Sequence, residues 1–263
     1  MYDFAYQKPG SVADAVKLLA TPDAKALAGG QTLIPVLKQR LNKPSVVVDL
    51  SKLGLSGITV TDTTVTIGAM TTHVTVANSA EVAKKIPALA ALAGNIGDRA
   101  VRYRGTIGGS LANNDPTADY PSAVLALGAT IKTDRRAIAA DDYFQGMFTT
   151  ALEPDEIIVS VAFPIPEKAA YMKVPNPASR YAMVGVFVAR GPNGVRVTVT
   201  GAGQNGVFRH AAFEKALAGN WSAAALNGVK TAADDLNSDI HGSAAYRAHL
   251  VDVMARRAVA AAG

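Results

Sequence analysis

The sequence predicts an α+β fold in three consecutive units, and its length, composition and periodicity each support this prediction. The chain has 263 residues, which is enough for two or three compact units. Hydrophobic residues make up 49% of it and charged residues 18%, so a sizeable core is expected and disorder is not. Segments with helical spacing alternate with short β-branched runs. We place the units at residues 1–55, 56–167 and 168–263.

The first unit is expected to be βαβ-like, with a glycine turn after its first strand. Ser11 can cap a helix, because Asp14 occupies the capping-box position in the first turn. The β-branched run over 45–50 is typical of a buried strand. The remaining predictions are an apolar helix face of Val12, Val16 and Leu19, a strand over 25–28, and a helix over 32–41 with Pro35 in its first turn.

The second unit is predicted to begin with a hairpin and to close with an alternating strand. Strands over 57–60 and 65–69 flank the turn Asp62-Thr63-Thr64, and the alternation over 156–163 predicts the closing strand. Between them we expect helices over 72–78, 87–93 and 120–127 and a strand over 129–133.

The third unit follows a segment, residues 164–179, whose proline and lysine content predicts a linker or crossing loop. Gly191-Pro192-Asn193-Gly194 is a strong turn signal between expected strands over 182–190 and 195–201. A final helix is expected over 243–261, with one apolar face formed by Ala245, Leu250, Val253 and Met254.

Two glycine-rich stretches are the most informative motifs for function. The first glycine stretch is Ala28, Gly29, Gly30, Gln31 and Thr32, and the second is Thr106, Ile107, Gly108, Gly109 and Ser110. Glycine allows positive φ and close approach, so two such loops can present backbone N–H groups to two phosphates. Taken alone, the first stretch is weak evidence, because a Gly-Gly pair after a strand is more often a tight turn than a phosphate site. It lacks the third glycine of the dinucleotide fingerprint and the Gly-Lys-Ser/Thr of a P-loop.

Two aspartates, Asp115 and Asp119, follow the second glycine stretch. A carboxylate beside a phosphate would repel it, so these side chains are better suited to sugar hydroxyls or ring N–H groups. They could instead cap the helix expected from residue 120, because helix N-termini favour negative charge. Both readings stay open from the residues alone.

The absence of cysteine from the chain places any iron–sulfur cluster on another chain and excludes disulfides and a cysteine nucleophile. The four histidines are too far apart for a metal site, so no metal is expected. The net charge is +5, but no basic run interleaves with aromatics, so no nucleic-acid partner is expected. No membrane-spanning run or signal peptide is visible, which favours the cytoplasm.

The two stretches and their flanks resemble the two FAD-binding signatures of the medium subunit of molybdenum hydroxylases. That family includes flavoprotein subunits of aerobic carbon monoxide dehydrogenase and of xanthine, nicotine and aldehyde dehydrogenases. The matching segments are Ala28-Gly29-Gly30-Gln31-Thr32-Leu33-Ile34-Pro35, Arg104-Gly105-Thr106-Ile107-Gly108-Gly109-Ser110-Leu111-Ala112 and Asp115-Pro116-Thr117-Ala118-Asp119-Tyr120-Pro121. Further similarity in the same order covers essentially the whole chain.

The resemblance implies a two-subdomain FAD-binding fold of the PCMH, vanillyl-alcohol-oxidase-like type over 1–55 and 56–167. Residues 168–263 would form a C-terminal α+β domain of the carbon monoxide dehydrogenase flavoprotein type. The implied role is an oxidoreductase subunit that carries FAD and passes electrons from the [2Fe–2S] clusters of a small subunit to an external acceptor. A large subunit would hold the molybdenum cofactor, in a dimer of heterotrimers. The alternatives are a stand-alone flavin-dependent oxidoreductase and an assembly subunit without FAD.

The resemblance also implies roles for single residues. Both glycine stretches would hold the FAD pyrophosphate through their backbones, and Gly97 would let the chain pass close to the flavin. Asp119 would bind the ribityl or ring region, and Ile158 would line the pocket beside the isoalloxazine with Lys173 nearby. No residue is expected to act as a catalytic acid or base. The chain departs from the family at two places. Tyr103 stands where the family often has asparagine, and we expect this difference to alter the flavin environment. Asn113-Asn114 stands where histidine-alanine is common.

Overall fold

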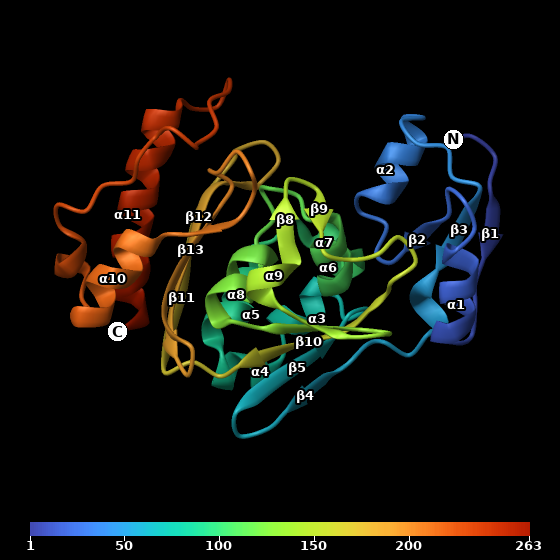
Figure 1. Ribbon diagram of the computed structural model, residues 1–263, viewed down its shortest axis with the longest axis horizontal. Helices are drawn as coiled ribbons and strands as arrows, with labels where there is room; N and C mark the ends of the chain where they lie inside the picture. Colours follow the sequence, from blue (N-terminus) through green and yellow to red (C-terminus); the bar gives the residue numbers. More distant parts are fainter.

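The computed structural model describes residues 1–263, and its elements follow one another along the length of the molecule (Figure 1). The N-terminal sheet and its helices lie at one end, and helices α10 and α11 lie at the other. The chain forms sheets of three, five and four strands, and a separate two-stranded ribbon. The strands therefore pair mainly with neighbours from the same stretch of sequence.

The first sheet has the order β1-β3-β2, and both pairings are parallel. Ser11 caps the first helix as predicted, since its side chain accepts a hydrogen bond from the Asp14 N–H. The predicted β-α-β arrangement is confirmed, but the edge strand β1 was not anticipated, because its residues are all exposed and show no β-branched run. The elements are β1 (Ala5–Gln7), α1 (Val12–Leu19), β2 (Lys25–Leu27), α2 (Leu33–Lys38), β3 (Val46–Asp49) and the 3-10 helix η1 (Leu50–Lys52).

The second sheet is antiparallel, in the order β4-β5-β10-β6-β7, and helices cover it. The predicted hairpin and closing strand are present. Its strands are β4 (Ile58–Val60), β5 (Thr64–Gly68), β6 (Thr130–Thr133), β7 (Ala137–Ala139) and β10 (Ile158–Pro164), and β8 (Phe144–Gly146) and β9 (Thr149–Thr150) form the ribbon. Its helices are α3 (His73–Ala77), α4 (Ala80–Lys85), α5 (Pro87–Gly94), α6 (Arg99–Arg104), α7 (Ile107–Asn113), α8 (Tyr120–Leu127) and α9 (Ala140–Tyr143).

The second glycine stretch is the start of helix α7 and not the loop that we expected. Thr106 caps this helix, and its Oγ1 accepts a hydrogen bond from the Gly109 N–H at 3.1 Å. Adjacent glycines have low helix propensity, which is why the sequence predicted a loop. Tertiary hydrogen bonds override that preference: Ile107 N–H donates to the Thr71 carbonyl and Gly108 N–H to the Ala69 carbonyl.

The third sheet runs β11-β12-β13-β14 and is antiparallel throughout. Its first strand, β11 (Lys168–Pro175), lies where we expected a linker, so that prediction is wrong. The strand is held because its two faces pack on different clusters, with Tyr171 on one side and Ala170 on the other. The other elements are β12 (Ala182–Gly191), β13 (Gly194–Thr200), β14 (Phe208–Arg209), α10 (Ala211–Gly219), η2 (Ala223–Leu226) and α11 (Ala244–Ala262).

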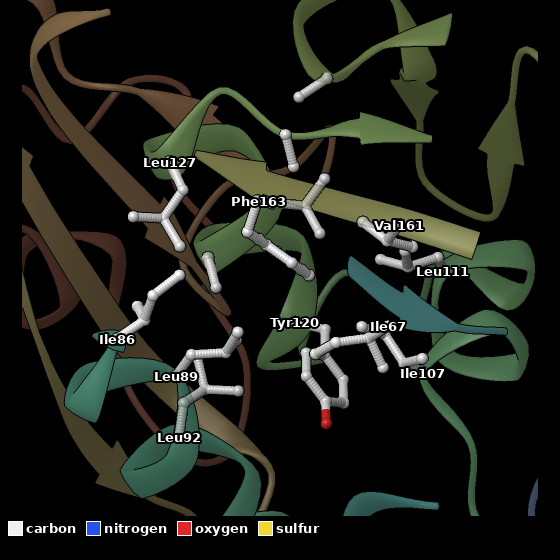
Figure 2. Close-up of a cluster of buried hydrophobic side chains, with 14 of the residues drawn as sticks. Ile67, Ile86, Leu89, Leu92, Ile107, Leu111, Tyr120, Leu127, Val161 and Phe163 are labelled. Carbon is white, nitrogen blue, oxygen red and sulfur yellow. The ribbon is translucent and has the colours of Figure 1, made fainter. Parts of the chain in front are cut away.

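The largest hydrophobic cluster has 29 buried residues and fills the space between the second sheet, helices α5 and α8, and the third sheet (Figure 2). A second cluster of 18 buried residues joins the third sheet to α10 and α11. The third sheet therefore separates two cores. In α11 Leu250 and Met254 are buried as expected, but Ala245 is exposed because the buried face begins at Arg247. No helix of the structure has the length and hydropathy needed to cross a membrane.

Candidate functional site

A cavity of about 560 Å³ lies between the first glycine stretch, the second sheet and the loop that precedes β12. This volume is within the range of small-molecule and cofactor sites. The predicted site residues that line it are Ala28, Gly29, Gly30, Gln31, Thr32, Gly97, Thr106, Gly108, Gly109, Ser110, Asp119 and Ile158. Two predicted residues do not line it: Ile107 is fully buried in the core, and Lys173 lies behind Asp119.

The two glycine stretches cross each other at the wall of this cavity. A Cβ at Gly29 would overlap the Arg104 carbonyl and stand 2.7 Å from the Cα of Gly105. A Cβ at Gly109 would stand 3.5 Å from the Cβ of Ala28. Glycine at position 29 is thus required for contact between two chain segments, in addition to any role toward a ligand.

The first glycine stretch carries a run of free backbone donors. None of the N–H groups of residues 28–32 donates a hydrogen bond within the chain, and all of these residues line the cavity. Positive φ at Gly30, +73°, turns the backbone here. Residues 28–30 are half-buried and residues 31 and 32 are exposed, so these N–H groups are open to a ligand, and a run of consecutive free donors is suited to an anion.

The second glycine stretch has far fewer free donors. The N–H groups of Ile107, Gly108, Gly109 and Ser110 are all bonded within the chain. Only the Thr106 N–H and the Ser110 hydroxyl remain without a partner. Our expectation that this stretch presents a row of N–H groups is therefore incorrect. The N–H groups of Ile107 and Gly108 anchor α7 to the segment before α3, and those of Gly109 and Ser110 bond to Thr106.

Asp119 is buried between the cavity and the third sheet. Its carboxylate accepts a hydrogen bond from the Tyr171 hydroxyl at 2.5 Å and pairs with the Lys173 ammonium at 3.0 Å. Lys173 also donates to the Asn95 carbonyl at 2.9 Å. Burial raises the pKa of the Asp119 carboxyl, and the neighbouring Lys173 charge and the two hydrogen bonds oppose this rise.

The alternative in which the two aspartates cap α8 is not supported by the geometry. Asp119 makes no capping hydrogen bond to that helix. Asp115 accepts hydrogen bonds from the N–H and the hydroxyl of Thr117, at 2.8 and 2.6 Å, and so shapes the turn before the helix. Asp115 also lines the cavity.

The cavity wall at Ile158 is held in place by Glu156. Arg136 donates two hydrogen bonds to the Glu156 carboxylate, at 2.9 and 2.8 Å, and the Thr133 hydroxyl donates a third at 2.7 Å. These donors, with Arg136 the strongest, lower the pKa of Glu156 to about 2. The adjacent Ile157 N–H donates to Asp134, which fixes the start of β10.

Several lining residues were not assigned to the site from the sequence. His73 and Met70 stand outside the segments quoted for the resemblance, whereas Leu152, Ser179, Arg180 and Tyr181 lie in segments that are similar to the family but carried no predicted site role. Arg180 has φ +63°, unusual for a residue with a side chain. Tyr103 is 65% exposed and lies outside this cavity, contrary to the expectation that it alters the cofactor environment. The structure contains no group of three or more His, Asp or Glu side chains that could hold a metal ion.

Comparison with known proteins finds relatives that match nearly the whole length of this chain. Residues 2–166 match the family described as the FAD binding domain in molybdopterin dehydrogenase. The chain is 38% identical to the nicotine 6-hydroxylase medium subunit of Paenarthrobacter nicotinovorans, over 98% of this chain and 96% of that protein. It is 37% identical to the carbon monoxide dehydrogenase medium chain of Afipia carboxidovorans, over 97% and 95%.

The structural comparison agrees. A chain of reconstituted CO dehydrogenase from Oligotropha carboxidovorans superposes with a TM-score of 0.90 at 36% identity, covering 99% of this chain and 98% of that chain. The fold class, the FAD cofactor and the oxidoreductase assignment predicted from the sequence are confirmed. The chain therefore belongs to the FAD-binding family of the molybdopterin dehydrogenases.

Proposed function

We propose that this chain is the FAD-carrying electron-transfer subunit of a heterotrimeric molybdenum hydroxylase. Electrons would reach its FAD from [2Fe–2S] clusters on a small partner subunit and leave to an external acceptor. A large subunit would hold the molybdenum cofactor, in a cytoplasmic dimer of heterotrimers. Relatives named as medium subunits of nicotine 6-hydroxylase and carbon monoxide dehydrogenase support this assignment. The absence of cysteine from the chain supports the placement of the clusters on a partner.

The observation that carries the proposal is the run of free N–H groups over 28–32 at the cavity wall. A pyrophosphate carries two negative charges and several acceptor oxygens, so it can satisfy several such donors at once. Gly29 and Gly108 allow close packing behind this wall, since a Cβ at either position would strike the neighbouring chain, and they place no side chain at the cavity. The residues present therefore fit the phosphate portion of FAD.

We assign the other site residues in the same way. Gly97, with φ +50°, would turn the chain along the flavin, and Ile158 would form an apolar wall beside it. Asp119 would face the ribityl or ring region of FAD. Lys173 would hold the Asp119 carboxylate in place from the side away from the cavity. Thr106 and Ser110 would add a backbone N–H and a hydroxyl to the phosphate site.

The proposed division into 1–55, 56–167 and 168–263 places this cofactor between the units. Support comes from the three larger sheets, whose strands fall within these limits. When bound, FAD supplies the chemistry that accepts electrons and releases them again. The chain binds and orients the cofactor, and its apolar wall excludes water from one side of the cavity. No acid or base of this chain is needed for that role.

The test is to purify the full chain alone and together with the products of its neighbouring genes. Visible spectra and assays for FAD, iron and molybdenum are recorded for each preparation. We expect one FAD per chain in both, and iron and molybdenum only in the assembly. A colourless chain that takes up no FAD, or an assembly without iron and molybdenum, would refute the proposal.

A pair of variants tests the site itself. Gly109→Val places a branched side chain against Thr106 and Ala28 at the crossing of the two stretches, and we expect loss of FAD binding. Gly10→Val is the matched control, because nothing lies within 4 Å of its Cβ position. Equal FAD contents of the two variants would contradict the location of the site. Gly108 is a poorer probe, since its Cβ would stand 2.7 Å from the Cβ of Ala69 in the core.

A further inference from the structure

His73 lies in the cavity wall, and its environment is unusual for a core residue. It is only 5% exposed, it begins helix α3, and its ring packs on the ring of Tyr120 with centroids 5.3 Å apart. Its Nδ1 is fully buried without a hydrogen-bond partner. Because this nitrogen has no acceptor for a proton, the orphaned Nδ1 bears on which ring nitrogen carries the hydrogen.

The two ring nitrogens differ in what they can reach. Nε2 also has no partner within the chain, but it is not fully buried, and His73 lines the cavity. A proton on Nδ1 would be a buried N–H group without an acceptor, whereas a proton on Nε2 stands at the cavity. The tautomer with Nε2–H is therefore favoured.

The position of Nε2 identifies the part of the ligand that it can reach. Nε2 packs against Gly105, so closely that a Cβ there would stand 2.5 Å from it. Gly105 is also the residue against which Gly29 packs, where the two glycine stretches cross. His73 thus lines the same cavity as the free N–H groups of the first glycine stretch, and Gly105 contacts both His73 and Gly29. The acceptor suited to this place is an anionic oxygen.

We propose that His73 is a further cofactor-binding residue, which donates a hydrogen bond from Nε2–H to a phosphate oxygen of FAD. This inference rests on the proposed function. The ring is uncharged when it does so, because burial, with a smaller contribution from Arg102, lowers the pKa of His73 to about 4. A neutral donor with its proton fixed by the buried Nδ1 gives a directed hydrogen bond at neutral pH.

The test compares three substitutions in the purified full chain by titration with FAD and with ADP. The amide nitrogen of glutamine can stand near the Nε2 position, that of asparagine near Nδ1, and phenylalanine keeps only the ring. We expect His73→Gln to bind FAD within about threefold of the unaltered chain, and His73→Asn and His73→Phe to bind about tenfold or more weakly. ADP affinity should fall in parallel, because the contact is to phosphate.

Two controls separate binding from folding. Melting temperatures and circular dichroism show whether each variant is folded, and His73→Phe preserves the packing on Tyr120. Tyr120→Phe removes the unpartnered buried hydroxyl of the neighbouring ring. Tyr120 does not line the cavity, so this variant should leave FAD affinity unchanged.

The outcomes are distinct for the two proposals. Unchanged FAD affinity in all three variants would show that His73 only packs, and would leave the proposed function intact. Rescue by asparagine and not by glutamine would overturn the assignment to Nε2. Loss of FAD affinity with unchanged ADP affinity would overturn the assignment to phosphate. If the unaltered chain binds no FAD, the proposed function fails and this inference fails with it.

Discussion

Replacement of Lys173 by methionine should destabilise the fold by leaving the Asp119 carboxylate buried without its cation. The two side chains are 8% and 4% exposed, and the ion pair measures 3.0 Å. Removal of one partner of such a buried pair costs about 3–5 kcal/mol in free energy of unfolding. For a chain of this size, each kcal/mol corresponds to about 2–4 °C in melting temperature. We therefore expect Lys173→Met to melt roughly 6–20 °C lower.

The pH dependence of this effect has a definite sign. Burial already raises the pKa of Asp119, and loss of the Lys173 charge raises it further. A carboxyl whose pKa is higher in the folded state favours folding when protonated. That contribution is complete below its unfolded pKa, about 3.9, and is lost as the pH rises through the folded value. The deficit of Lys173→Met should thus be larger at pH 8 than at pH 5.

Urea unfolding of the purified chain measures both effects. Lys132→Met is the matched control, because Lys132 is exposed on a strand and should change stability by less than about 0.5 kcal/mol. The double variant Asp119→Asn with Lys173→Met should recover at least about 1 kcal/mol over the single variant, since no buried charge remains. The reasoning fails if Lys173→Met costs under about 1 kcal/mol, or if the double variant is no more stable.

Three further predictions concern the scaffold of the site. Gly29→Ala should lower both FAD content and melting temperature, whereas Gly109→Ala should be mild, because only the first Cβ strikes backbone; equal melting curves would contradict this. Glu156→Gln should lower the free energy of unfolding by about 1–3 kcal/mol at pH 7, because Arg136 is half-exposed and solvent partly screens its ion pair with Glu156. Since the pKa of Glu156 is lowered to about 2, that difference should shrink between about pH 4.5 and 2, and a pH-independent difference would refute it. Asn114 has φ +43°, and its side-chain amide donates hydrogen bonds to two carbonyls of the β8–β9 ribbon. Urea unfolding should show that Asn114→Gly lowers the free energy of unfolding through loss of these bonds, and that Asn114→Ala lowers it further, because alanine is also strained at positive φ.

The sequence predicted most of the elements, and most of the site residues that it predicted line one cavity, because both predictions depend on local patterns. Helix spacing, Ser11 as a cap and the turn at 191–194 act over a few residues. The strand β11 was missed because a strand buried on both faces shows no alternation, and its lysines suggested a surface. Lys173 is buried by pairing with Asp119, 54 residues away, and one sequence does not reveal such pairs.

The site residues also divide into those that a local pattern indicates and those that only the tertiary structure brings to the cavity. The glycines were found because their chemistry is local, and it is visible in the residue type itself. His73, Arg180 and Tyr181 reach the cavity only because α3 and the loop before β12 fold against it. The segment around Arg180 and Tyr181 is similar to the family pattern but indicated no site role, and no motif marks His73, so their place at the cavity is visible only in the tertiary structure.

The two glycine stretches looked equivalent in the sequence, but the structure gives them different tasks. The first has unpaired N–H groups and is the part that can bind an anion. In the second, Ile107 and Gly108 donate to the carbonyls of Thr71 and Ala69, so its glycines allow a helix to pack directly on the core. A binding loop with free donors is poorly held by its own hydrogen bonds. The anchored second stretch, which meets the first where Gly109 faces Ala28, supplies the rigid surface that the first stretch lacks. Substitutions that displace it from the core, as at Gly108, should therefore impair cofactor binding through loss of support.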